Sequence, residues 1–208
     1  MFSLTVPNMA AKITRTIFRD RKVDEDRFAI VKYGVEIFLV NVTKGITVYL
    51  AAALLGMIWQ TLVVHLSYLM IRRHSFGLHA KTSLGCTITS VVMFVVLPYF
   101  VKDVQLSGWM IVLISALILL NIAIFSPSDT ENMPLFNARK RHKLRLKSFF
   151  NTLVVLFFVQ IVSHEDIKVM ILLGACLQML LIHPLTYRIF RRRYNNYETV
   201  QKESQRNE

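Results

Sequence analysis

Cysteine is scarce in this chain, and so are acidic residues. The 208 residues include two cysteines, Cys86 and Cys176, which lie far apart in separate apolar stretches. So few cysteines exclude a disulfide framework, and we expect two reduced thiols. Only 13 Asp and Glu residues stand against 25 Lys and Arg residues. The first 27 residues contain no continuous apolar core, so no cleavable signal peptide is expected.

Several signatures of common enzyme classes are also missing. The chain has no His-Glu-x-x-His zinc-protease motif, no Gly-rich phosphate loop, no Gly-x-Ser-x-Gly elbow and no internal repeat. A structural zinc site built from His74, His79 and Cys86 needs a fourth ligand, and no close-spaced Cys or His pair supplies one. We therefore expect no metal and no cofactor, which leaves cysteine chemistry as the enzymatic option.

Apolar residues are abundant and are segregated from the charges. The chain is 54% hydrophobic, its mean hydropathy is +0.45 and its formal net charge is +12. Long apolar runs alternate with short basic clusters, which is typical of transmembrane helices joined by basic loops, with the lipid bilayer as partner. Nucleic-acid binding is not expected, because each basic cluster is short and abuts an apolar run.

The runs predict an all-α, polytopic integral membrane protein with about six transmembrane or membrane-embedded helices. The predicted spans are 28–44, 46–71, 83–101, 108–126, 148–163 and 167–183. Gly45 is the predicted break between the first two spans. One side of the membrane then holds 21 of the 25 Lys and Arg residues, in segments 1–27, 72–81, 127–147 and 184–208. This asymmetry predicts that both termini are cytoplasmic.

The same reading divides the chain into three parts. Residues 1–27 form a basic N-terminal segment, in which hydrophobic residues at helical spacing allow an amphipathic helix and charge bias alone is the alternative. Residues 28–183 form the transmembrane domain. Residues 184–208 form a cytoplasmic tail that is first basic and then polar.

The stretch RRHSFGLHAKTSLGC, from Arg72 to Cys86, carries the reactive residues. Thr82 and Ser83 are good N-cap residues, so a helix is expected to start there with Cys86 in its first turn, where the helix dipole favours a thiolate. His79 precedes Cys86 by seven residues, which is about 10.5 Å along one continuous helix and too far for a hydrogen bond. His79 must therefore lie outside the helix, and Gly77 is able to make the turn that folds its loop back.

Each of these residues also has an ordinary structural interpretation. A lone Cys in a transmembrane helix is usually a small buried hydrophobe, and this is the interpretation we give Cys176. His65 and His183 are interpreted as hydrogen-bonded packing residues. Lys32 and Glu36 stand four apart on one helix face, and as an intramembrane pair they would mark a pathway in a non-enzymatic transporter or signalling scaffold, the alternative function.

The arrangement Arg-Arg, then Gly-x-His, then Cys seven residues after the His resembles the AgrB family, the accessory gene regulator protein B of Gram-positive quorum-sensing systems. The stretches FSPSDTENMPL and VKYGVEIFLVNVTKG are similar to that family's loop after the central span and to its N-terminal region. The likeness covers residues 25 to 195. It implies a membrane-embedded cysteine endopeptidase in the bacterial cell membrane, with its active site at the cytoplasmic face.

The resemblance also implies roles for single residues. Cys86 matches the nucleophile and His79 its general base, while Arg72 and Gly77 match supporting positions. The implied substrate is an AgrD-type propeptide, cleaved through an acyl-enzyme thioester and cyclised to a thiolactone autoinducing peptide. A homodimer is compatible with the family. Orienting partners for the histidine are Asp129, Glu131 and Ser75, and none of them is expected to be required.

The basic stretch NARKRHKLRLK supplies a second hypothesis. AgrD-type precursors carry an acidic C-terminal tail, which the basic side chains of this loop would hold, although charge bias alone also explains their place. The proposed substrate-binding residues are Arg139, Lys140, Arg141, Lys143, Arg145 and Lys147.

Overall fold

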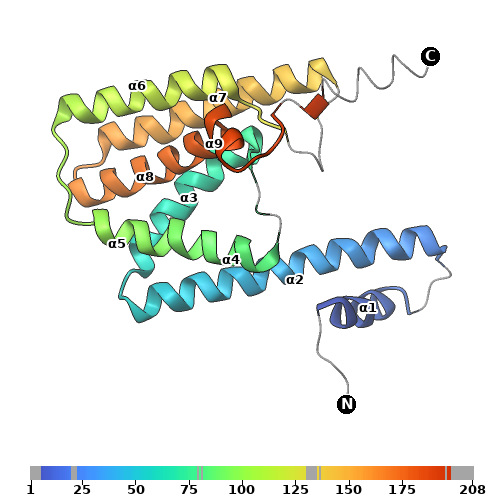
Figure 1. Ribbon diagram of the computed structural model, residues 1–208. Coiled ribbons are helices and arrows are strands. Elements are labelled where there is room, and N and C mark those ends of the chain that lie inside the picture. Colours follow the sequence, from blue (N-terminus) through green and yellow to red (C-terminus); the bar gives the residue numbers. More distant parts are fainter. Residues whose placement is uncertain are drawn as a thin grey trace.

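The computed structural model describes residues 6–19, 23–78, 80, 82–129, 135, 137–194 and 196–197, and every regular element among them is helical (Figure 1). The helices are α1 (Val6–Ile17), α2 (Glu25–Leu54), α3 (Ile58–Ser75), α4 (Ser83–Val91), α5 (Leu97–Val101), α6 (Gly108–Phe125), α7 (Ala138–Ile161), α8 (Glu165–Ile182) and α9 (Pro184–Ile189). A short π-helix, η1 (Val92–Val96), joins α4 to α5. The all-α prediction is confirmed for this part of the chain.

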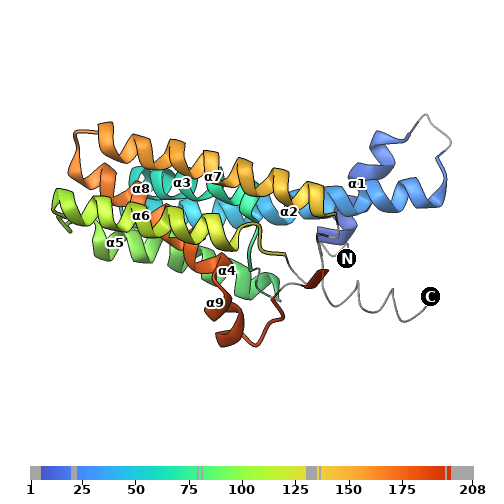
Figure 2. The ribbon, with the colours of Figure 1, turned by 90° about the horizontal axis from the view of Figure 1, so that it is seen from above.

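Four helical segments of the described chain are long and apolar enough to cross a membrane. They are Glu25–Leu54, Ser83–Val101, Gly108–Phe125 and Ala138–Ile161. The two other predicted spans correspond to α3 and α8, which lie inside the bundle and are each 18 residues long; α3 ends in Arg72 and Arg73, and α8 begins with Glu165, Asp166 and, two residues later, Lys168. Helices α6 and α7 run side by side in both views, whereas α3 crosses α8 at an angle (Figure 1), and α2 projects past the bundle toward α1 (Figure 2).

The predicted break at Gly45 is wrong. Helix α2 runs without interruption from Glu25 to Leu54, and Gly45 lies inside it. A helix tolerates an interior glycine at a cost of about 1 kcal/mol, which its neighbours' backbone hydrogen bonds and packing offset. The chain turns instead at Gly56, where φ is +66° and where the amides of residues 55, 56 and 57 bond back to carbonyls of the last helical turn. The second span consequently begins near residue 58 rather than 46.

The centre of the bundle is the contact between α3 and α8. Gly174 of α8 makes it possible, since a Cβ at this position would meet the Ser67 hydroxyl, the Val64 carbonyl oxygen at 2.5 Å and the Tyr68 amide at 3.1 Å. Helix α7 covers the other side of α3, where the Asn151 amide donates to the Met70 carbonyl at 2.7 Å. The absence of a side chain at one residue thus sets the distance between the two central helices.

A buried hydroxyl ties the η1 region to α3. Pro98 has no amide hydrogen, so it cannot bond to the Phe94 carbonyl four residues earlier. The Thr61 hydroxyl donates to that carbonyl at 2.7 Å, and Thr61 is fully buried. This bond fixes the helix that begins with α4 against the neighbouring α3.

Helix α1 packs against the start of α2, and this pair lies beside the main bundle (Figure 1). Ala10 and Thr14 of α1 are fully buried, whereas Met9, Ile13 and Ile17 are exposed along another face. Near the start of α2, Lys32 and Glu36 form the expected pair, with Nζ and Oε1 3.6 Å apart.

Candidate functional site

Cys86 lies in the first turn of α4, as the sequence predicts. Thr82 is the N-cap residue, and its side chain accepts a hydrogen bond from the Gly85 amide at 3.1 Å. The Cys86 amide donates to the Thr82 carbonyl at 3.0 Å, which continues the helix from its first turn. The Cys86 side chain is a free, partly exposed thiol at the N-terminal end of this helix.

The predicted base, His79, lies outside the described residues. Its neighbours Leu78 and Ala80 are described, and both line the cavity that Cys86 also lines. The loop between α3 and α4 is therefore part of the cavity wall on either side of His79.

The cavity has a volume of about 740 Å³ and lies between α2, α3 and α4. Each helix contributes residues at spacings of three and four, so that one face of each helix turns toward the cavity. The walls comprise Asn41, Lys44, Gly45 and Val48 of α2, His65, Tyr68, Leu69 and Arg72 of α3, Cys86, Thr89 and Ser90 of α4, and Met93 of η1. Phe190 and Arg192, which follow α9, also line the cavity. No Asp or Glu of the described chain lines it, so its charged walls are basic.

Arg72 organises the loop that leads to His79. Its guanidinium donates to the carbonyls of Phe76 at 3.2 Å and Leu78 at 3.1 Å, and it approaches Gln178 Oε1 at 3.4 Å. The guanidinium also lies over the Tyr68 ring, 5.4 Å from the ring centroid. A planar group with several fixed donors is suited to hold two carbonyls of a loop at once.

Gly77 makes the predicted turn, with φ at +113°. A Cβ there would lie 3.0 Å from the Leu181 carbonyl oxygen and 3.2 Å from Ile182 Cγ2. The Gly77 amide donates to the Ser128 carbonyl at 3.1 Å, and the Leu78 amide donates to the Leu181 carbonyl at 3.1 Å. The turn is thus pressed against the end of α8 and against the loop that follows α6.

The described candidates for orienting the histidine are already engaged elsewhere. The Ser75 hydroxyl donates to the Ile71 carbonyl at 2.9 Å and accepts from Gln178 Nε2 at 2.6 Å. The Asp129 carboxylate, which is 4% exposed, accepts from the backbone amides of Asn196 and Tyr197, both at 2.9 Å. Glu131 lies outside the described residues. These bonds tie Ser75 to α3 and α8, and Asp129 to the C-terminal segment.

The basic stretch expected to be a loop is helical. Asn137 caps α7 by accepting from the Lys140 amide at 3.1 Å, and the following Arg, Lys and Leu residues are good helix formers. Arg141 donates to the Leu135 carbonyl at 2.7 Å, and Arg145 donates to the Ser126 carbonyl at 2.7 Å. These two arginines therefore stabilise the protein's own loop. The remaining basic residues of the set are exposed: Arg139, Lys140, Lys143 and Lys147.

Sequence reasoning missed several residues of the cavity. Lys44 looked like an ordinary residue near a span end, yet it lies within α2 and lines the cavity. His65 is hydrogen-bonded to the Tyr49 hydroxyl at 3.2 Å, as expected of a packing residue, but it also lines the cavity. The signal that would have revealed these residues is the spacing of polar residues along α2 and α3. By contrast, Lys32 and Glu36 do not line it.

The sequence matches one protein family over most of its length. The family model described as accessory gene regulator B, AgrB, matches residues 10–182. The chain belongs to the AgrB family. A putative AgrB-like protein of Listeria innocua is 41% identical over 198 residues, which cover 95% of this chain and 97% of that protein. The resemblance inferred from the Arg72–Cys86 stretch is thereby confirmed.

More distant AgrB relatives agree with this assignment. A putative AgrB-like protein of Clostridium acetobutylicum is 30% identical over 94% of this chain and 93% of its own. The accessory gene regulator protein B of Staphylococcus epidermidis is 27% identical over 81% of this chain and 86% of its own. No solved structure matches the chain. AgrB membership assigns the protein a role in the agr quorum-sensing system and implies a propeptide substrate, and its four apolar helices fit a membrane protein.

In the described part of the AgrB chain, no three His, Cys, Asp or Glu side chains come together in a group that could hold a metal ion. His74, one member of the metal site considered from the sequence, is hydrogen-bonded through Nδ1 to the Asn151 amide at 2.9 Å. The cavity holds the Cys86 thiol at a helix start and the basic side chains of Lys44, Arg72 and Arg192 in its walls.

Proposed function

We propose that this AgrB protein is a membrane-embedded cysteine endopeptidase that cleaves an AgrD-type propeptide and promotes its cyclisation to a thiolactone autoinducing peptide. Cys86 is the nucleophile and His79 its general base. The observation that carries the proposal is the position of Cys86 in the first turn of α4, on the wall of a cavity that both neighbours of His79 also line. Arg72 and Gly77 are positioning residues, because they shape the loop just before His79.

The reaction proceeds in two acyl transfers. His79 takes the proton of the Cys86 thiol, and the thiolate attacks the carbonyl carbon of the scissile peptide bond. The C–N bond breaks, the leaving amine receives the proton from His79, and the N-terminal part of the precursor stays on Cys86 as a thioester. The thiol of an internal precursor cysteine then attacks this thioester. The bond between the acyl carbon and the Cys86 sulfur breaks, the new thioester bond closes the thiolactone ring, and Cys86 recovers its thiol proton.

The proposed topology is a multi-pass protein of the bacterial cell membrane, with six spans, cytoplasmic termini and a cytoplasm-facing cavity mouth. The distribution of charge supports this topology. Arg72 and Arg73 at the end of α3 and the basic first turns of α7 belong to one end of the bundle, whereas Lys102 after α5 and Lys168 near the start of α8 belong to the opposite end. Reporter fusions at residue 208 and in the 102–107 loop would be active on opposite sides. The same side for both fusions would contradict the topology. A homodimer stays a prediction.

The decisive experiment is co-expression of the chain with a tagged precursor, followed by blotting and mass spectrometry. Cys86→Ala and His79→Ala are expected to lower cleavage by at least about a hundredfold at equal membrane levels. Cys176→Ala is the matched control. It should cleave the precursor normally, since Cys176 packs against the core of the bundle and is not among the residues that line the cavity. Cleavage that persists without Cys86 would overturn the site assignment and favour the transporter or scaffold alternative.

The exposed basic residues of α7 are proposed to hold the acidic tail of the precursor. Arg139, Lys140, Lys143 and Lys147 are free of the internal backbone contacts that occupy Arg141 and Arg145. Replacing the four exposed residues with Gln should weaken precursor binding without unfolding the chain. Replacing Arg141 and Arg145 should instead lower stability. Unchanged cleavage and binding in the fourfold variant would remove this docking role.

A further inference from the structure

Helix α9 is buried against the bundle through Tyr187, and two residues that follow this helix line the cavity. Tyr187 of α9 is 1% exposed, and its carbonyl accepts a hydrogen bond from the Arg192 amide at 2.8 Å. This turn brings Phe190 and Arg192 to the wall of the cavity that Cys86 also lines. We call residues 190–193 the rim of the candidate active site.

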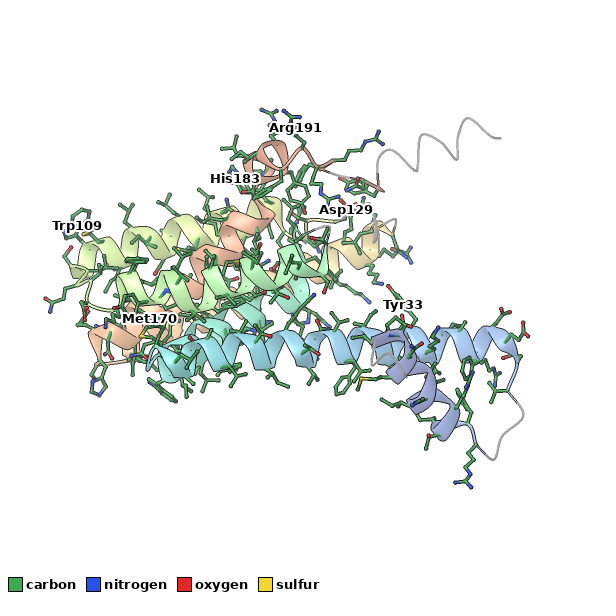
Figure 3. All side chains as sticks on the ribbon, turned by 60° about the horizontal axis from the view of Figure 1, so that its bottom comes forward. Tyr33, Trp109, Asp129, Met170, His183 and Arg191 are labelled. Atoms are coloured by element: carbon green, nitrogen blue, oxygen red, sulfur yellow. The ribbon has the colours of Figure 1, made fainter. Side chains whose placement is uncertain are left out.

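Three consecutive arginines occupy this rim, and the structure distinguishes them. Arg191 and Arg193 are exposed, whereas Arg192 is half-buried and lines the cavity. Arg191 points away from the bundle (Figure 3). The positive-inside rule would explain all three arginines equally. It does not explain why Arg192 alone of the three lines the cavity, and this position is the reason to assign Arg192 a separate role.

The rim is fastened to the rest of the protein by Asp129. Its carboxylate accepts from the amides of Asn196 and Tyr197, and its carbonyl accepts from the Tyr187 hydroxyl at 3.0 Å. Figure 3 shows Asp129 in the loop near the start of α7, facing the end of the chain. Two separate points of the C-terminal segment, before and after the arginines, are thus bonded to one residue.

The same loop also holds the turn before His79. Ser128, next to Asp129, donates through its amide to the Ser75 carbonyl at 2.9 Å and accepts from the Gly77 amide at 3.1 Å. Its hydroxyl donates to the Ile182 carbonyl at 2.9 Å, directly before α9 begins. One loop therefore sets the positions of the rim and of the reactive turn relative to each other.

We propose that Phe190 and Arg192 form a peptide-binding subsite in the cavity wall and that Asp129 is the positioning residue that holds it. Arg192 donates to carbonyl or carboxylate oxygens of the bound peptide, and the exposed Phe190 ring packs against its side chains. This inference rests on the proposed function. The proposed occupant is the stretch of the propeptide after the scissile bond, because the acidic tail implied by the family resemblance complements the basic side chains of Lys44, Arg72 and Arg192 in the cavity wall.

The chemistry of the cavity supports a peptide as the occupant of this subsite. The described walls carry Lys44, Arg72 and Arg192 and no carboxylate, so the cavity attracts oxygen acceptors along its depth. A peptide backbone offers such acceptors at every residue.

The test is kinetic and uses the purified full-length chain in lipid nanodiscs with a synthetic precursor. Arg192→Gln is expected to raise KM about tenfold with kcat within twofold of wild type, since a charge-assisted hydrogen bond formed equally in ground and transition states is lost. Arg191→Gln and Arg193→Gln remove the same charge from the same segment and should leave KM unchanged. Equal KM values for all three variants, whether raised or unaltered, would overturn the inference.

Asp129 is tested by graded replacement. Asp129→Ala should reproduce the rise in KM, and Asp129→Asn, which keeps one acceptor oxygen, should restore part of the loss. A change in melting temperature with no change in KM would show that Asp129 serves folding only and would reject its positioning role.

A binding measurement separates this inference from the proposed function. In a Cys86→Ala background, which cannot form the thioester, Arg192→Gln should still weaken precursor binding about tenfold. Arg192-dependent binding together with Cys86-independent cleavage would contradict only the proposed chemistry. Cys86-dependent cleavage with binding insensitive to Arg192 would contradict only the subsite.

Discussion

Replacing Gly77 by alanine is the sharpest test of how the turn before His79 is built. The backbone of Gly77 has φ at +113°, a conformation that L-residues adopt at a cost of about 1–3 kcal/mol. The added Cβ would also lie 3.0 Å from the Leu181 carbonyl oxygen, so the end of α8 has to shift. If this free energy acts only on the turn, the population of the native loop falls roughly 5- to 160-fold. Precursor cleavage should fall by the same factor.

The assay compares initial cleavage rates at matched membrane levels, together with melting temperature in detergent. Gly34→Ala is the matched control, because Gly34 lies within α2 and a Cβ there meets no atom within 4 Å. This control should cleave normally, and its melting temperature should stay level or rise, since alanine favours a helix by about 1 kcal/mol over glycine. Wild-type cleavage by Gly77→Ala would refute the argument that this turn positions the base.

Three further predictions concern the scaffold around the site. Arg72→Lys keeps the charge but cannot hold two carbonyls with one planar group, so the initial cleavage rate should fall about tenfold or more. Gly174→Ala drives a methyl group into the Ser67 hydroxyl and the Val64 carbonyl; the overpacking should cost about 1–3 kcal/mol and lower the melting temperature. Burial, and after it the Asp129 carboxylate, raise the pKa of Tyr187. Tyr187 therefore ionises at a lower pH in the unfolded chain than in the folded protein, so the stabilisation that is present below about pH 10 is lost as the pH rises further. The melting temperature measured from about pH 8 to 11 should fall for the wild type, and Tyr187→Phe should reduce this pH dependence.

Local patterns predicted the helix starts better than the breaks between helices. Thr82 at the start of α4 acted through contacts with residues three and four positions later, which the sequence displays directly. Gly45 misled the prediction because a glycine within a helix and a glycine in a turn look alike in sequence. Its neighbours decide between them, and Gly56 supplied the positive φ that the turn required. The basic stretch after Asn137 was similarly mistaken for a loop, since charge says where a segment lies and not whether it is helical.

The sequence by itself determined the all-helical class, the segregation of apolar and basic segments, the family, and the order Arg72, Gly77, Cys86 along one short stretch. These features depend on residues that are near one another in the chain. The tertiary structure alone decided that Lys44, Arg72 and Arg192 share one cavity, and that Asp129 binds the C-terminal segment rather than the reactive turn. The bonds from Asn196 and Tyr197 to Asp129 join residues more than sixty positions apart. They arise from the packing of helices, which no local pattern records.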